Sequence, residues 1–305
     1  MSSGIIELKN VGKYYGDREV LRGINLEVYR GESLALLGPK GSGKTSILKM
    51  LYGFSYPSSG EIYVLGMNVR ANIREIKTRI GVIPQDDSLE EDFTVIENLK
   101  IYSQYHEVPK NEVTERCLSL LRTMNLENYS ERPVTGLPLL ARRKLLIARA
   151  IIHKPETIII DEPTRDLDLE DRLSLLQLIK KIKSSNISVL LATQDGVAAQ
   201  LLCDRVAFID GGRILGVDKP DKLIESLIGK YVVEIGCNDH EINYYTNKLQ
   251  TERMDYLVVR NTILVMLKDG QDPRRILDQA VGFKATIRRP CLDDVFLKLS
   301  GHQMR

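Results

Sequence analysis

The residues with the clearest potential for chemistry read GPKGSGKT and occupy positions 38–45. They fit the pattern GxxxxGK[ST]. An apolar run typical of a buried parallel strand, SLALL, precedes them, and a stretch expected to be helical follows over 45–52. Glycines in such a loop let backbone N–H groups turn inward around phosphates, and the N-terminus of the helix favours negative charge. A glycine-rich turn with an incidental lysine would not need this strand and helix, so the segment is predicted to bind nucleotide phosphates.

Two positions of this loop have specific expected roles. Lys44 should reach the β- and γ-phosphates, and the hydroxyl of Thr45 should bind Mg²⁺. The residues expected to surround the phosphates are Gly38, Pro39, Lys40, Gly41, Ser42, Gly43, Lys44, Thr45 and Ser46.

A pair of carboxylates forms the second candidate group, within TIIIDEPT at 157–164. An apolar strand that ends in Asp161 is typical of a carboxylate that holds the hydration shell of Mg²⁺. Glu162 follows directly and can accept a proton from an attacking water, which would make it a catalytic residue. The pair is a weak signal alone and a strong one downstream of a phosphate loop, so a nucleoside triphosphate and Mg²⁺ are the expected cofactors.

The elements that must position these residues alternate between strands and helices. Near the N-terminus, IIELKN and INLEVYR are typical of antiparallel strands joined by a turn-rich YYGDR. The elements predicted further on are a strand over 79–84, helices over 94–124, a strand over 157–160, a helix over 169–183, the strand SVLLAT, the helix VAAQLL and a hairpin around Gly211 and Gly212. This alternation predicts an α/β fold with a mostly parallel sheet.

A different segment begins near Lys219 and Pro220. It is expected to contain the strand YVVEI, the helix HEINYYTNKL, the strands YLVVR and TILVML, the helix DPRRILDQAV, the strand KATIRR and the final helix LDDVFLKLS. The order β-α-β-β-α-β predicts a small α+β ferredoxin-like domain. We therefore expect an ATP-binding domain over 1–220, with a helical subdomain at about 90–150, and an accessory domain over 221–305.

Composition excludes several classes of protein. A net charge of +2 over 305 residues gives no basic footprint for a nucleic acid. The four cysteines are scattered, with no CxxC pair, which predicts reduced thiols in a reducing compartment. The N-terminus MSSGIIELKN lacks the pattern of a secretion signal. The sequence also contains no uninterrupted run of about 18 apolar residues, so no membrane span is predicted. The expectation is a soluble, cytoplasmic protein.

With these motifs in place, residues 5–216 resemble the nucleotide-binding subunit of an ABC transporter, which implies a P-loop NTPase with a RecA-like core and an antiparallel β subdomain. By this resemblance Tyr15 stacks on adenine, with Tyr14 as the alternative. Gln85, in GVIPQDDSL, corresponds to the Q-loop glutamine, which touches Mg²⁺ and water and responds to the membrane subunit. TRDLD at 164–168 occupies the D-loop position, with Asp166 where the family commonly has Gly or Ala.

The C-terminal end narrows the resemblance. IRRPCLDDVFLKLSG at 287–301 is similar to the closing segment of ATPases from ABC-2 type exporters, among them drug-resistance, sodium-efflux, nodulation-factor and gliding-motility subunits. The resemblance implies a peripheral location on the cytoplasmic face of the cell (inner) membrane. Its implied partners are an ABC-2 type permease and a second ATP-binding subunit, in a homodimer or a heterodimer.

The family signature LSGGQ is degenerate in this chain, because LPLLA stands in its place at 137–141. In the family, the signature serine and glycines contact the γ-phosphate of ATP held by the opposite subunit. Pro138 has neither a hydroxyl nor a backbone N–H, and Leu139 and Leu140 add side chains where glycine allows close approach. The helix that follows can still begin here, since proline is tolerated in a first turn. Of the two interpretations of the basic residues at 142–144, a solvated helix face is favoured over a functional surface.

A second departure lies in LLATQD at 190–195, where Gln194 replaces the switch histidine of the family. Glutamine can donate a hydrogen bond to the γ-phosphate or the attacking water, so Gln194 is counted with Glu162 as catalytic, but it cannot become charged. The four histidines lie elsewhere and are expected to be structural: His106, His153, His240 and His302.

The two departures predict weakened hydrolysis, since losing one electrostatic stabiliser of a transition state costs about 10²–10³ in rate. The preferred interpretation is an ATP-binding subunit of an ABC-2 type exporter with weak ATPase activity. The alternative is a pseudo-ATPase scaffold that binds ATP and organises a membrane complex. A translation or DNA-repair ABC protein is disfavoured, because the chain lacks a second ATPase half and long coiled coils. The cargo and the permease are not predicted.

Overall fold

The computed structural model describes residues 4–183, 186–280 and 284–301. The chain divides into two compact units, Met1–Ile214 and Leu215–Arg305. Of the segments considered above, the first three residues of the N-terminal segment, Val281 of the predicted helix and His302 lie outside the described residues.

The first unit is built around a six-stranded sheet in the order β10-β9-β3-β8-β7-β6, and the boundary between the two units falls within the edge strand β10. Its strands are β3 (Ser33–Leu37), β6 (Ile80–Ile83), β7 (Thr157–Asp161), β8 (Ser188–Thr193), β9 (Arg205–Asp210) and β10 (Arg213–Asp218). The pairs β9–β3, β3–β8, β8–β7 and β7–β6 are parallel, which confirms the mostly parallel sheet predicted from the alternation of elements. Every residue of β3, β7 and β8 is buried, as expected for strands covered on both faces.

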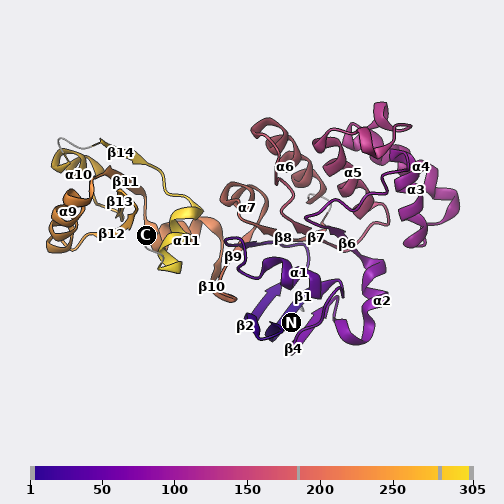
Figure 1. Ribbon diagram of the computed structural model, residues 1–305, viewed down its shortest axis with the longest axis horizontal. Coiled ribbons are helices and arrows are strands. Elements are labelled where there is room, and N and C mark those ends of the chain that lie inside the picture. The colour runs from indigo at the N-terminus through magenta and orange to yellow at the C-terminus, as the bar shows by residue number, and fades with distance from the viewer. Residues whose placement is uncertain (1–3, 184–185, 281–283, 302–305) are drawn as a thin grey trace. The chain divides into compact units, whose positions relative to one another are not determined.

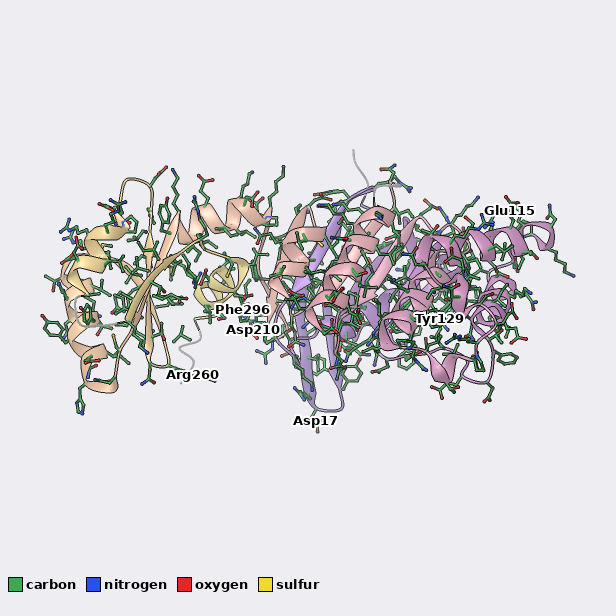
Figure 2. All side chains as sticks on the ribbon, turned by 90° about the horizontal axis from the view of Figure 1, so that it is seen from above. Asp17, Glu115, Tyr129, Asp210, Arg260 and Phe296 are labelled. Atoms are coloured by element: carbon green, nitrogen blue, oxygen red, sulfur yellow. The ribbon has the colours of Figure 1, made fainter. Side chains whose placement is uncertain are left out.

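Helices cover one face of this sheet and a second sheet lies beyond the other (Figure 1). On one side are α5 (Leu139–Ile151), α6 (Leu169–Lys183) and α7 (Gly196–Leu202); on the other side are α1 (Lys44–Leu51) and the antiparallel sheet. That sheet has the order β2-β1-β4-β5 and consists of β1 (Ile6–Tyr15), β2 (Arg18–Val28), β4 (Ser59–Val64) and β5 (Met67–Asn68). The first two strands are longer than predicted and meet in a tight hairpin with Asp17 at its tip (Figure 2).

The remaining elements of the first unit are mostly helical. They are α2 (Val69–Arg79), α3 (Val95–Tyr105), α4 (Lys110–Met124) and the short 3₁₀ turns η1 (Glu127–Tyr129) and η2 (Val134–Gly136). A capping box fixes the start of α3, because Thr94 and Glu97 satisfy each other's backbone N–H groups. The two helices predicted between 94 and 124 are therefore present. Within the described residues, no helix combines the length and apolar character needed to cross a bilayer.

The second unit contains a four-stranded sheet in the order β12-β13-β11-β14, with antiparallel neighbours. Its elements are α8 (Pro220–Leu223), the π-helical turn η3 (Ile224–Ile228), β11 (Tyr231–Gly236), α9 (Asp239–Thr251), β12 (Asp255–Val259), β13 (Thr262–Leu267), α10 (Pro273–Gln279), β14 (Lys284–Arg288) and α11 (Leu292–Ser300). From β11 to β14 the elements follow the predicted order β-α-β-β-α-β. Figure 2 labels Arg260 at the turn between β12 and β13.

An apolar core and an ion pair between the partly exposed Arg288 and the buried Asp294 hold this second unit together. Val233, Ile235 and Val265 of the sheet pack with Tyr245 and Leu249 of α9. The start of α11 is tied to β14 by two hydrogen bonds from Arg288 to the carboxylate of Asp294, of 2.7 and 2.6 Å, and Arg288 also bonds Glu234 at 2.6 Å. These bonds raise the pKa of Arg288, the carboxylate of Asp294 being the main cause.

Candidate nucleotide site

A cavity of about 420 Å³ opens beside the loop that joins β3 to α1. Its lining contains most of the residues that the sequence predicts for a nucleotide site. The lining residues are Tyr15, Arg18, Val20, Lys40, Gly41, Gly43, Lys44, Thr45, Ser46, Gln85, Glu162, Arg165 and Gln194. The other four predicted residues, Gly38, Pro39, Ser42 and Asp161, do not line it.

The glycines of the loop are needed for different reasons. Gly43 caps α1 with φ 108°, and Gly41 has φ 84°, a backbone conformation that side chains disfavour. Gly38 has no positive φ. A Cβ at Gly38 would lie 2.0 Å from the backbone oxygen of Ile209 in β9, so close packing against the neighbouring strand requires glycine there. The glycines of the motif therefore allow the loop to pack closely against β9 as well as to curve.

Lys44, the first residue of α1, is 5% exposed. Its Nζ donates to the backbone oxygens of Gly38 at 2.7 Å and Pro39 at 2.9 Å, and lies 3.7 Å from Oε1 of Glu162. Burial lowers the pKa of Lys44, and the charge of Glu162 opposes that shift. The arrangement places a cation at the base of the cavity beside the candidate catalytic carboxylate.

Two buried polar atoms of the site have no hydrogen-bond partner in the described part of the chain: Oδ1 of Asp161 and Oγ of Ser42. Buried polar atoms are normally satisfied, so such atoms fit groups supplied by a ligand. Burial raises the pKa of Asp161, and the neighbouring Thr45 hydroxyl opposes that shift. Mg²⁺ bound with phosphate takes oxygen ligands, and the Asp161 carboxylate and the Thr45 hydroxyl supply such oxygens beside the loop. These two residues therefore fit the ion.

Glu162 is tied to the end of β8 by both its backbone and its side chain. Its N–H donates to Ala192 O at 2.9 Å, and its Oε2 accepts from Gln194 N at 3.2 Å and Thr193 Oγ1 at 3.3 Å. Glu162 also has φ 42°, in the left-handed region. The structure thus brings the two predicted catalytic positions, Glu162 and Gln194, into direct contact. The contact runs through the backbone of Gln194, and Gln194 also lines the cavity.

Tyr15 lines the cavity at the β1–β2 hairpin, opposite Arg18 in the strand register. The alternative aromatic, Tyr14, does not line it, because its hydroxyl donates to Glu19 at 2.9 Å. Both tyrosines are 47% exposed, and Nζ of Lys13 lies 4.8 Å from the ring centroid of Tyr15. Of the two, Tyr15 is placed to meet a base bound in the cavity.

Gln85 lies in a segment that is hydrogen-bonded to side chains of α5. Arg143 Nη1 donates to the backbone oxygen of Gln85 at 3.0 Å, and Arg149 Nη1 donates to the backbone oxygen of Ser88 at 2.6 Å. The position of Gln85 in the cavity wall therefore depends on the helix that follows the degenerate signature.

The prediction that residues 142–144 form a solvated helix face is wrong for two of the three residues. Arg143 is buried, and Arg142 bonds Asp87 at 2.5 Å and Glu91 at 2.9 Å, with its side chain 16% exposed. Only Lys144, which is partly exposed, fits that expectation. The carboxylates that pair with Arg142 lie more than fifty positions earlier in the chain, so sequence spacing could not reveal them.

The segment LPLLA forms the start of α5, as expected. Pro138 is the residue before the helix, with φ −56°, and Arg142 N donates to its carbonyl oxygen at 3.0 Å. Leu137 is buried, Pro138 is exposed, and Leu139 is 39% exposed. The surface at this helix start is apolar and offers no side-chain hydroxyl.

Three lining residues were not predicted: Arg18, Val20 and Arg165. Thr193, which bonds Glu162, was also missed.

Among the histidines, His106 and His153 stack with ring centroids 3.9 Å apart, and burial lowers the pKa of both. This pair is structural, as expected, and neither residue lines the cavity. All four cysteines are free, and three are buried.

Comparisons with known proteins agree with this site. The sequence model of the ABC transporter family matches residues 21–165. The Nod factor export ATP-binding protein I of Cupriavidus metallidurans is 36% identical, with 99% of each chain covered. The protein of the same name from Rhizobium etli is also 36% identical, over 98% of this chain and 94% of that one.

Solved structures share this fold over most of the chain. An ATP-binding subunit of an ABC transporter superposes with a TM-score of 0.67 at 26% identity, covering 73% of this chain and 92% of that one. The ATP-binding cassette MJ0796, a dimer bound to ADP and Pi in a post-hydrolysis state, gives 0.64 at 26% identity, covering 70% and 98%. With its phosphate loop, paired carboxylates and full-length relatives, this chain belongs to the ABC transporter family and is one of its ATP-binding, ATP-hydrolysing subunits.

Proposed function

We propose that this chain is the ATP-binding subunit of an ABC-2 type exporter, and that it couples ATP binding and slow hydrolysis to a membrane permease. The observation that carries the proposal is the cavity in which Lys44, Glu162 and Gln194 meet beside the phosphate loop. The closing segment at 287–301 supports the ABC-2 type, and the names of the two relatives, which refer to export, support the direction of transport.

In the proposed site, Lys44 binds the β- and γ-phosphates and Tyr15 stacks on adenine. Glu162 accepts the proton of the attacking water, and Gln194 donates a hydrogen bond toward the terminal phosphate. The remaining phosphate contacts come from the loop residues Gly38, Pro39, Lys40, Gly41, Ser42, Gly43, Thr45 and Ser46.

We assign Mg²⁺ to Thr45 and Asp161, with Gln85 beside them. The ion would neutralise charge on the β- and γ-phosphates. The unsatisfied Oδ1 of Asp161 supports this assignment.

Slow hydrolysis follows from what two positions lack. Gln194 stays neutral near pH 7, and Pro138 offers neither a hydroxyl nor an N–H to a phosphate held by a partner subunit. In a homodimer both deficits fall on each ATP. In a heterodimer with an intact partner, each ATP would meet one of them.

We further propose that residues 221–305 form a ferredoxin-like accessory domain and residues 1–220 the ATP-binding domain, with its helical subdomain at about 90–150. The strand order β12-β13-β11-β14 and the order of elements from β11 to β14 support the first assignment. The partners would be a permease and a second ATP-binding subunit, on the cytoplasmic face of the cell membrane.

Nucleotide titration of the purified chain tests the proposal. Wild type should bind Mg-ATP, and Lys44→Ala should abolish binding because it removes the cation at the base of the cavity. Lys77→Ala on the exposed surface of α2 is the matched control and should bind as wild type does. Absence of binding to wild type would overturn the assignment.

Membrane sedimentation tests the partner. Expressed with its native permease, the chain should pellet with membranes, and expressed alone it should stay in the supernatant. Pelleting to the same extent without a permease would contradict docking to a permease. ATP turnover measured with the permease present separates the coupled ATPase from a scaffold that only binds ATP.

A further inference from the structure

Arg165 lines the nucleotide cavity together with Lys44, Glu162 and Gln194, although no motif assigns it a role there. It follows β7 by four residues, and its backbone N–H donates to the carbonyl oxygen of Glu162 at 3.2 Å. This turn brings the chain back toward the cavity after the catalytic carboxylate. Arg165 therefore lines the same cavity as the groups that surround the terminal phosphate in the proposed site.

The guanidinium of Arg165 is available for a ligand. Among the described residues its one ion pair is with the adjacent Asp166 at 3.4 Å, where the two side chains are 44% and 70% exposed. Exposed pairs of this kind contribute little, about 0–1 kcal/mol. No hydrogen bond to a protein acceptor occupies its side chain in the described part of the chain, whereas Arg142, Arg143 and Arg149 all donate to the loop before them.

Charge in the cavity favours a polyphosphate. The cations that line it are Arg18, Lys40, Lys44 and Arg165, against the single carboxylate of Glu162. Lys44 already contacts two backbone oxygens and lies near Glu162. Arg18 lies beside Tyr15 at the hairpin, where a base would bind. Arg165 lines the cavity together with Gln194 and Glu162, and its backbone bonds that of Glu162. Among the four cations it is therefore the candidate for the terminal phosphate.

The chain also lacks other donors at that position. Gln194 is neutral, and LPLLA supplies no hydroxyl or glycine N–H to a partner's phosphate. A guanidinium presents paired donors that match phosphate oxygens, and an arginine at the transferred phosphoryl group contributes about 10³–10⁵ in rate in other P-loop enzymes.

We propose that Arg165 is a catalytic residue that donates hydrogen bonds to the γ-phosphate of ATP held by the same chain. The proposal rests on the proposed function of the site. In the hydrolytic step the water oxygen bonds the γ-phosphorus, the bond from phosphorus to the β–γ bridging oxygen breaks, and the water proton passes to Glu162. ADP and phosphate leave, and Arg165 stabilises the charge that gathers on the γ-phosphate oxygens.

Binding of ATP and ADP to Arg165→Ala tests this role directly, at protein concentrations where sedimentation shows a monomer, so that only this chain's residues act. The Kd for ATP should rise about tenfold or more, since a hydrogen bond to a charged group contributes about 1.5–3 kcal/mol. The Kd for ADP should stay within about twofold, because ADP lacks the γ-phosphate. Arg165→Lys should retain part of the preference for ATP, because lysine keeps the positive charge but lacks the paired N–H donors of the guanidinium.

Two control variants bracket the result. Arg18→Ala should weaken ATP and ADP equally, because it acts beside the base. Arg74→Ala, on the exposed face of α2, should change neither. Single-turnover phosphate release by Arg165→Ala should fall by about 10³ or more.

Three results would overturn the inference. Arg165→Ala and Arg165→Lys with wild-type affinity for both nucleotides would show that the guanidinium does not contact ATP. An equal loss for ATP and ADP would place it away from the γ-phosphate. Failure of wild type to bind either nucleotide would remove the proposed function itself, which the wild-type titration reveals before any variant is compared.

Discussion

The hydroxyl of Thr193 donates to Oε2 of Glu162 at 3.3 Å and accepts from the backbone N–H of Asp195 at 3.0 Å. A hydroxyl has one hydrogen, so the N–H of Asp195 directs that hydrogen toward the carboxylate of Glu162, the proposed catalytic residue. Thr193 thereby positions Glu162 from the neighbouring strand.

Replacing Thr193 by valine should reduce the rate of phosphate release about tenfold or more, because a hydrogen bond to a charged group contributes about 1.5–3 kcal/mol. The Kd for ATP should stay within about twofold, since Thr193 does not line the cavity. Thr193→Ser keeps the hydroxyl and should restore most of the rate. Equal rates for the valine and serine variants, both folded by circular dichroism, would show that the hydroxyl does not position Glu162.

Gly38→Ala should destabilise the first unit by about 3 kcal/mol or more, because the new Cβ would overlap the backbone oxygen of Ile209. Gly136→Ala is the matched control. Gly136 has no atom within 4 Å of an added Cβ and no positive φ, so its effect should stay within about 0.5 kcal/mol. Urea unfolding of both variants measures the difference, and equal midpoints would contradict the close approach of the two strands.

Stability should fall as the pH is lowered from 7 to 5, in part because of His153. Its Nε2 lies 3.0 Å from Ile80 O, its ring stacks on His106, and burial lowers its pKa from 6.5 to about 4, with His106 and Arg116 adding to the shift. The unfolded chain therefore takes up a proton below pH 6.5, and the folded chain takes it up only near pH 4. Stability from the neutral ring is lost through that window.

The test is the change in Tm between pH 7 and pH 5. His153→Phe keeps an aromatic ring in the stack and should show a smaller drop than wild type. His240→Gln, on the exposed surface of α9, should show the wild-type drop. A drop in His153→Phe as large as in wild type would mean that other groups account for the pH dependence.

Arg288→Met should destabilise the second unit by about 3 kcal/mol, because it leaves the buried carboxylate of Asp294 without its charged partner. Hydrogen exchange of the β11 and β14 amides reports on this unit alone. Arg289→Met removes a contact with the Tyr231 ring, and its effect should stay at about 1 kcal/mol or less. Similar exchange in the two variants would argue against a structural role for the Arg288–Asp294 pair.

The fold and the core of the site were predictable because their signals are local. The phosphate loop is one continuous motif between a strand and a helix, and Asp161 and Glu162 end a β-branched strand. Residues that act across the sheet were not predictable. Thr193 reaches Glu162 because Asp161 of β7 pairs with Ala192 of β8, a register that pattern alone does not specify.

The same limit explains the misjudged face of α5. A basic run at a helix start is compatible with solvent, and only folding brings Asp87 and Glu91 onto Arg142. Arg165 belongs to TRDLD, which the resemblance placed at the D-loop position, but the motif did not show that this residue lines the cavity. Both cases depend on contacts between segments distant in sequence or on the path of a turn.

Steady-state phosphate release tests the central claim of a weakened ATPase most directly. The variants to compare with wild type are Gln194→His, the triple variant Pro138→Ser with Leu139→Gly and Leu140→Gly, and their combination. Wild type should turn over well below about 1 s⁻¹, an ordinary enzymatic rate, and each repair should raise the rate. If the two deficits act on one transition state, the combination should exceed the product of the single effects. A wild-type rate of about 1 s⁻¹ or more that no repair changes would contradict the claim.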